Sequence, residues 1–242
     1  MTDHKFDDLY GEAMRSISSS FSADFSLIDL LHHVVEECRD VLGIDDVGIV
    51  LADPDGRLHV LAATSERTTL VEAMQVDSGT GPCMESYRTG QSVTIQDFYG
   101  RSDEFSTLAR EQGFKSVYAT PLRRHIYAMG AINLFAAQAH ASTEDRRTIA
   151  DAFARITAVA VLVDRRSQGP TDRLEEALRA RADIDSAKRI VMRQIRSDEI
   201  GALQTIRTYA DQNMLSLVSV AREVISNGLV LEERLPDVSP LI

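Results

Sequence analysis

Four basic side chains stand close together in the last third of the sequence, where they could bind phosphate groups. Lys188, Arg189, Arg193 and Arg196 form a run with no acidic residue among them. A lysine binds phosphate as a point charge, whereas an arginine can donate two parallel hydrogen bonds. The run therefore predicts a phosphate-facing patch, although a solvated helix face explains the same pattern equally well.

An aromatic residue follows this run in a segment of mostly polar residues. Tyr209 lies beside Arg207 and Thr208. A ring next to a cation can stack on an unpaired base, which is how proteins commonly read single-stranded nucleic acid. The alternative is a half-buried tyrosine of the core, and Tyr209 taken alone favours that alternative.

The cysteine, histidine and acidic residues of the sequence do not have the spacing of a catalytic site or of a metal site. Cys83 follows Pro82 at the expected start of a helix, where a thiol can become reactive. The only other cysteine is Cys38, so we favour a buried structural thiol. No spacing of histidine, cysteine and acidic residues indicates a zinc or iron site, and Gly79 and Gly81 lack the lysine of a phosphate loop. We therefore predict that the chain is not an enzyme, and its cofactor, if it has one, is unknown.

The net charge of −11 is distributed unevenly along the chain. Residues 172–230 hold nine basic and nine acidic residues, while residues 1–171 hold 16 basic and 25 acidic residues. The acidity thus belongs to the first part, and a basic surface on the second part is compatible with the overall charge. No stretch approaches the roughly 20 apolar residues of a membrane-spanning helix, and residues 1–8 lack an apolar secretion segment. We expect a cytoplasmic protein without a membrane partner.

Strands and short helices alternate in the first part of the chain. A β-hairpin is predicted around residues 53–56, where proline presets φ and glycine accepts a positive φ. The periodicity predicts helices over 24–42, 67–75, 82–89 and 103–112, and strands over 47–52, 58–63, 92–95, 116–121 and 126–136.

A long helix is expected after Ser142, which can cap its first turn. Apolar residues alternate four and three positions apart along it, as in a helix that pairs with another helix. This seam predicts a homodimer, and burial against the domain's own sheet is an equal alternative. Its residues are Ile149, Phe153, Ile156, Ala160 and Val163.

Only helices are expected beyond Gly169 and Pro170, which interrupt the seam. Apolar positions recur at helical spacing in three segments, with Ser197 as the expected cap of the second helix and Gly228 as the stop of the third. Three helices in under 60 residues bury little core, so packing against the preceding long helix or against a second subunit is expected to help.

The first part of the chain resembles the GAF family over residues 24–166. The best local matches are residues 79–85 (GTGPCME) with 88–93 (RTGQSV), and the later strands 116–122 (SVYATPL) and 130–135 (GAINLF). The resemblance implies an α+β domain with a central antiparallel sheet, helices on one face and a small-molecule pocket on the other. That pocket is expected between the sheet and segments 67–75 and 103–112, with Tyr118, Thr120 and Asn133 directed into it. Side chains that fill this space are the alternative.

The second part resembles the ANTAR family over residues 172–230, an all-α module of three helices. The ordered series 174–178 (LEEAL), 184–188 (IDSAK), 206–210 (IRTYA) and 217–221 (LVSVA) carries the resemblance. Arg189 stands where the family commonly has glycine, and residues 196–198 replace a glycine-containing turn.

These two resemblances together imply a signal- or ligand-responsive regulator that acts by transcription antitermination. A dimer would bind a pair of RNA hairpins in a nascent transcript, and the GAF domain could take a small-molecule ligand. A GAF-based protein-interaction sensor with weak or no RNA binding is the alternative. The RNA-binding residues implied are Arg181, Ala187, Lys188, Arg193, Arg207 and Tyr209.

Overall fold

The computed structural model describes residues 11, 15, 26–124, 127–167 and 170–231. The chain divides into two compact units, Met1–Ala177 and Leu178–Ile242, and the division falls within helix α7, Pro170–Ile195. No helix among the described residues is long and apolar enough to cross a membrane.

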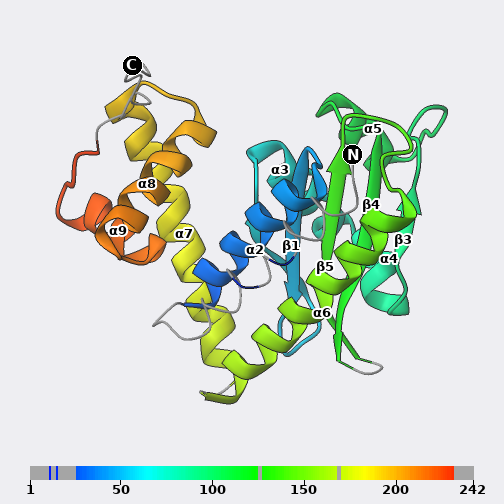
Figure 1. Cartoon of the computed structure of the whole chain (residues 1–242), viewed down its shortest axis with the longest axis horizontal. Coiled ribbons are helices and arrows are strands. Elements are labelled where there is room, and N and C mark those ends of the chain that lie inside the picture. Colours follow the sequence, from blue (N-terminus) through cyan, green and yellow to red (C-terminus); the bar gives the residue numbers. More distant parts are fainter. Residues whose placement is uncertain (1–10, 12–14, 16–25, 125–126, 168–169, 232–242) are drawn as a thin grey trace. The chain divides into compact units, whose positions relative to one another are not determined.

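The first unit is built on a five-stranded antiparallel sheet with the strand order β2-β1-β5-β4-β3 (Figure 1). The hairpin predicted around residues 53–56 is confirmed: the carbonyl of Asp53 accepts from the amide of Gly56, whose φ is +82°. All five expected strands are present, as β1 Asp46–Ala52, β2 Leu58–Ala63, β3 Val93–Ile95, β4 Ser116–Arg124 and β5 Tyr127–Ala136.

Helices cover both faces of this sheet, so the expected arrangement with helices on one face only is wrong. Helices α2, Leu27–Leu42, and α6, Glu144–Ser167, pack on one face. Helices α3, Glu66–Ser78, α4, Pro82–Thr89, and α5, Glu104–Glu111, lie on the other. Every residue of β1 is buried, because a central strand between two helical layers exposes neither face.

Short polar side chains set the helix starts, sometimes one residue away from the expected position. Ser26 and Asp29 form a capping box at the start of α2. Helix α6 begins after Thr143, whose hydroxyl accepts from the amide of Arg146 at 3.3 Å, rather than after Ser142. A cap must lie directly before the first helical residue for its oxygen to reach the third amide.

The predicted seam on α6 is partly used inside the first unit. Helix α6 packs against β4 and α2, and Phe153 is fully buried. Of the other seam residues, Ala160 is buried and Ile149 and Ile156 are half-buried; Val159, outside the seam, is 56% exposed. Burial against the domain's own sheet therefore accounts for Phe153, while the partly exposed residues leave the homodimer a prediction. The side chain of Val163 lies outside the described residues.

The second unit is all-helical, as predicted. It contains most of α7, then α8, Glu199–Asn213, and α9, Leu217–Ser226. Asp198 rather than Ser197 caps α8, since its carboxylate accepts from the amide of Gly201 at 2.8 Å. Apolar residues from all three helices form the core, including Ile184, Val191, Ile206, Val220 and Val224.

Candidate ligand groove and candidate RNA interface

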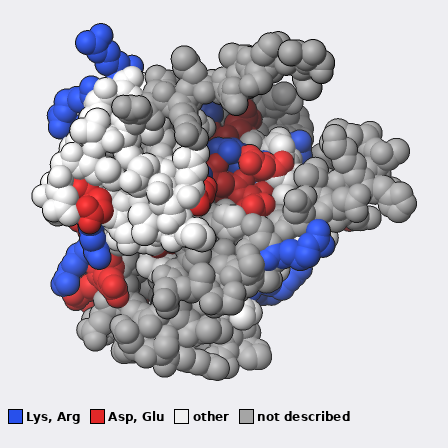
Figure 2. All heavy atoms as spheres, turned by 60° about the vertical axis from the view of Figure 1, so that its left-hand side comes forward, with Lys and Arg blue, Asp and Glu red and all other residues white. Residues whose placement is uncertain are grey.

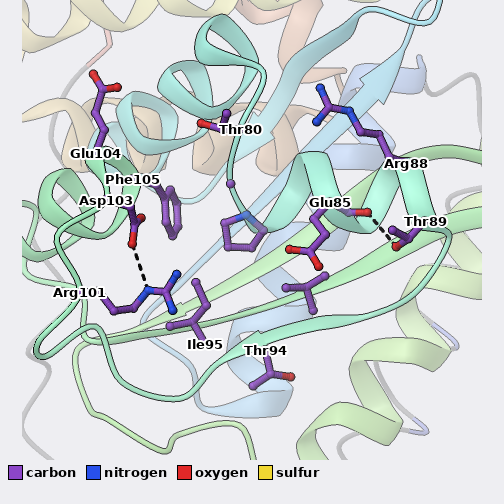
Figure 3. Close-up of a pocket in the computed structure, with 13 residues that line it drawn as sticks. Thr80, Glu85, Arg88, Thr89, Thr94, Ile95, Arg101, Asp103, Glu104 and Phe105 are labelled. Atoms are coloured by element: carbon purple, nitrogen blue, oxygen red, sulfur yellow. Dashed lines mark hydrogen bonds and ion pairs between the residues drawn. The ribbon is translucent and has the colours of Figure 1, made fainter.

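A groove of about 660 Å³ lies at the edge of the sheet in the first unit (Figure 3). Strand β3, which ends the sheet, forms one side, and α4 with the residues before α5 form the others. Pro82, Ile95 and Phe105 supply apolar lining, while Thr80, Thr89 and Thr94 add hydroxyls. Apolar walls with a few polar groups are typical of small-molecule sites.

Charged side chains of both signs line this groove. Figure 3 shows Glu85 and Arg101 reaching toward its middle from different sides, whereas Glu104 points outward. Arg101 Nε donates to Asp103 at 3.1 Å and to the hydroxyl of Ser106 at 3.0 Å. Desolvation works against ionisation of Asp103, but hydrogen bonds from Ser106 and the charge of Arg101 hold the pKa of Asp103 below its ordinary value.

The groove overlaps only in part with the expected ligand pocket: strand β3 and residues 103–105 line it, but residues 67–75 do not. Fully buried side chains from the sheet, from α3 and from the segment around α5 fill the space between the sheet and residues 67–75 and 103–112. They form one apolar cluster, which includes Val71, Phe98, Phe105, Phe114 and Phe135. The groove opens beside this cluster, at β3, which has only three residues and is the edge strand of the sheet that the structure describes.

The three residues expected to line one pocket lie on opposite faces of the sheet. The hydroxyls of Tyr118 and Thr120 both donate to Asp151 Oδ1 on α6, at 2.8 and 2.6 Å. Asn133 pairs with Ala119 in the register of β4 and β5, so it shares the other face, toward α3. Burial and the charge of Asp151 raise the pKa of Tyr118 to about 12. Tyr118 and Thr120 thus attach α6 to the sheet, and the three residues do not meet in one cavity.

Asn133 belongs to a buried polar cluster centred on Glu72 of α3. Asn133 Nδ2 donates to Glu72 Oε1 at 2.7 Å, and Gln75 Nε2 donates to Glu72 Oε2 at 3.1 Å. The amide of Cys83 donates to Gln75 Oε1 at 3.0 Å. Glu72, Gln75, Cys83 and Asn133 are all fully buried, and burial raises the pKa of Glu72 to about 8 despite these donors.

Sequence reasoning missed Glu72 and Gln75, although a signal for them existed. Thr68, Val71, Glu72 and Gln75 recur at helical spacing and form the buried side of α3. Polar residues on the same helix face as Val71 could therefore have been recognised as core residues that need partners.

Both cysteines are buried free thiols. The thiol of Cys83 hydrogen-bonds to Glu72, and burial together with this carboxyl raises the pKa of Cys83 well above its ordinary value. Burial also raises the pKa of Cys38. A thiol that resists ionisation is a poor nucleophile, which agrees with the structural role expected of Cys83. Among the described residues no group of three metal-ligating side chains comes together.

Lys188 in the second unit is bound to acidic side chains rather than displayed on the surface. Its ammonium contacts Asp185 Oδ1 at 2.8 Å and Glu199 Oε1 at 2.9 Å, and the residue is only 9% exposed. Burial lowers the pKa of Lys188, but the two carboxylates outweigh that effect and raise it above its ordinary value. Lys188 therefore links α7 to the start of α8.

The other residues proposed for RNA binding differ in accessibility. Ala187 is fully buried in the core, so its side chain serves packing. Arg181 is half-buried and lies 3.6 Å from Asp185. Arg193 is exposed on α7, while Arg207 and Tyr209 are half-buried on α8. On the face drawn in Figure 2, basic side chains lie in several separate places, with acidic side chains beside some of them.

Family comparisons match both units of the chain. A model of the GAF domain matches residues 26–162, and a model of the ANTAR domain matches residues 172–225. A comparison with curated proteins gives no significant match.

Solved structures with the same fold as the first unit include a reductase and GAF domains of other proteins. The free methionine-R-sulfoxide reductase from Neisseria meningitidis is 16% identical with a TM-score of 0.53, over 66% of this chain and 92% of that one. The GAF domain of a phosphoenolpyruvate-protein phosphotransferase from Coxiella burnetii is 16% identical with a TM-score of 0.52, over 65% and 95%. The phycocyanobilin-bound GAF domain of a cyanobacterial phytochrome is 17% identical with a TM-score of 0.51, over 66% and 97%.

At these identities the structural likeness concerns the fold alone, whereas the GAF match covers more than half of the chain. The chain therefore belongs to the GAF family and carries an ANTAR domain after its GAF domain.

Proposed function

We propose that the chain is a signal-responsive RNA-binding regulator that acts by transcription antitermination in the cytoplasm. The observation that carries the proposal is the ANTAR match over residues 172–225, which coincides with helices α7, α8 and α9. ANTAR domains are RNA-binding antiterminators and GAF domains are sensors. The RNA would be a pair of hairpins in a nascent transcript, bound by a homodimer so that each subunit takes one hairpin.

Tyr209 is the residue best placed to select a base in such a hairpin. It is half-buried on α8, with Asn213 Nδ2 donating to its backbone carbonyl at 2.8 Å. A half-buried ring keeps part of its surface accessible, and that part can stack on an unpaired loop base. Arg207 lies two residues earlier on the same helix and is half-buried as well.

An RNA-binding assay on the full chain tests this function. Hairpin pairs with matched and scrambled loops would be titrated at two salt concentrations, since contacts to phosphate weaken as salt rises. We expect tighter binding to one loop sequence than to its scrambled form. Equal affinity for both would refute sequence-specific recognition.

We further propose the groove beside β3 as the site at which the GAF domain receives its signal. Glu85 and Arg101 are directed toward the middle of the groove, above an apolar lining. This arrangement suits a small polar ligand with a cationic group opposite Glu85. Native mass spectrometry of the purified chain would show a retained small molecule, and Glu85→Arg should abolish its retention. Retention unchanged by Glu85→Arg would place the ligand elsewhere.

A protein-interaction sensor with weak or no RNA binding is the second candidate. The ion pairs of Lys188 with Asp185 and Glu199 favour it, because they occupy a cation that phosphate would otherwise attract. Absence of binding to every hairpin, also in the presence of the retained ligand, would decide for this candidate.

A further inference from the structure

Three exposed arginines stand at the end of α7. Arg189 and Arg193 lie on α7, and Arg196 directly follows its last residue with a φ of +54°. A spacing of four residues places Arg189 and Arg193 one above the other on the same face of the helix. The left-handed backbone at Arg196 takes that residue off the helical path, beside the end of this face. We call Arg189, Arg193 and Arg196 the arginine stripe.

The arginine stripe is free of ion pairs within residues 174–231, whose side chains the structure describes. Among those residues the stripe makes one side-chain hydrogen bond, from Arg189 to the hydroxyl of Ser186 at 3.0 Å. On α9, by contrast, Arg222 contacts Asp183 at 2.9 Å. The stripe therefore keeps its three positive charges, although residues 172–230 have no net charge.

Lys188 explains why neighbouring acids do not neutralise the stripe. Asp185 lies four residues before Arg189, a spacing at which ion pairs form on helices. Its Oδ1 instead accepts from Lys188, and its Oδ2 faces Arg181 at 3.6 Å. Glu199, three residues after Arg196, is bound by the same ammonium of Lys188. One buried lysine thus holds two of the nearby carboxylates, and a third, that of Asp198, accepts from the amide of Gly201 as the cap of α8.

We infer that the arginine stripe binds the phosphate backbone of RNA, and that Lys188 acts as a positioning residue that draws acids away from it. The inference rests on the proposed function, because RNA is the polyanion that an ANTAR domain would meet. Arginine suits this task, since its planar fork pairs with phosphate oxygens in two hydrogen bonds. The alternative is that these cations only stabilise the end of α7, through their interaction with the helix dipole.

Salt dependence distinguishes the two roles, because each phosphate contact adds about 0.7–0.9 to the slope of log affinity against log salt. The full chain would be titrated with a hairpin pair between 50 and 200 mM salt. We expect Arg193→Gln to lower the slope by about 0.7–0.9, the value of one phosphate contact. The triple change of Arg189, Arg193 and Arg196 to glutamine should lower it by roughly three times as much. Arg222→Gln is the matched control: it removes the same charge from α9 and should keep the wild-type slope.

The outcomes separate the inference from the function on which it rests. A triple variant with the wild-type slope would overturn the inference and leave RNA binding standing. So would an equal loss of slope in Arg222→Gln and Arg193→Gln, since the effect would then be general charge. If circular dichroism shows that the triple variant has lost helix, and binding falls in proportion, the inference would be overturned, because the arginine stripe would then only stabilise the end of α7. Failure of the wild-type chain to bind any hairpin would overturn the proposed function and the inference together.

Discussion

Replacing Glu72 with glutamine should remove much of the pH dependence of folding of the GAF domain between pH 5 and 8. Glu72 is fully buried against Asn133, Gln75 and Cys83, and burial raises its pKa from 4.5 to about 8. The folded chain therefore holds a proton that the unfolded chain releases over this range. Stability from such a group is present at low pH and is lost as pH rises toward 8.

The magnitude follows from the size of the pKa shift. Burial raises the pKa of Glu72 from 4.5 to about 8, and each tenfold difference in proton affinity between the folded and unfolded chain is about 1.36 kcal/mol, so the full effect is about 5 kcal/mol. Between pH 5 and 8 we expect the wild-type chain to lose about 3–4 kcal/mol relative to Glu72→Gln. The amide also disturbs the hydrogen bonds of the cluster, but that cost is independent of pH and cancels when slopes are compared.

Urea unfolding followed by circular dichroism at pH 5, 6, 7 and 8 measures this difference. Asp103→Asn is a control of opposite sign, because the pKa of Asp103 lies below its ordinary value. The stability that Asp103 contributes is lost only as pH falls below this range, so its difference from the wild type should be constant between pH 5 and 8. A constant difference between wild type and Glu72→Gln across these pH values would refute the reasoning.

Four further changes test other parts of the molecule. Asp151→Ala leaves the hydroxyls of Tyr118 and Thr120 without their acceptor and should lower the free energy of unfolding in urea by about 2–4 kcal/mol, since a hydrogen bond to a charged group contributes about 1.5 kcal/mol or more. A loss below about 0.5 kcal/mol would show that these two hydrogen bonds do not attach α6 to the sheet. Lys188→Met keeps the aliphatic stem and should lower stability by about 1–3 kcal/mol in urea unfolding, and it should also weaken RNA binding because Asp185 and Glu199 are then released beside the arginine stripe; unchanged stability would deny that Lys188 links α7 to α8. Ile156→Asp puts a charge on the half-buried side of α6 and should weaken a homodimer, provided that light scattering finds the native chain dimeric. Tyr209→Ala should cost about 1–3 kcal/mol of binding to the matched hairpin, more than to a scrambled one, and an equal loss for both would argue against stacking.

The sequence alone predicted most elements of both domains, because their signals are local. The turn at residues 53–56 identifies the β1–β2 hairpin, and helical periodicity identifies α2 and the helices of the second unit. Caps shifted by one residue, from Ser142 to Thr143 and from Ser197 to Asp198, since neighbouring polar residues give nearly the same signal. The GAF and ANTAR families were likewise indicated by the sequence, because each motif is a short run of neighbouring residues and the motifs follow one another in a fixed order.

The tertiary structure decided which side chains meet. Strand alternation places Tyr118 and Thr120 on one face, but only the register of β4 with β5 puts Asn133 opposite Ala119, on the other face. The groove likewise depends on how α4 and the start of α5 pack beside β3.

The basic run shows the same division between local and tertiary information. Residues 188–196 contain no acid, and the sequence therefore indicated a uniform cationic segment. Folding brings Glu199 of α8 to Lys188 and leaves Arg189, Arg193 and Arg196 exposed. Sequence order determined which charges exist and which helix face each occupies, whereas helix packing decided which of them are neutralised, because an ion pair needs its two groups within about 4 Å.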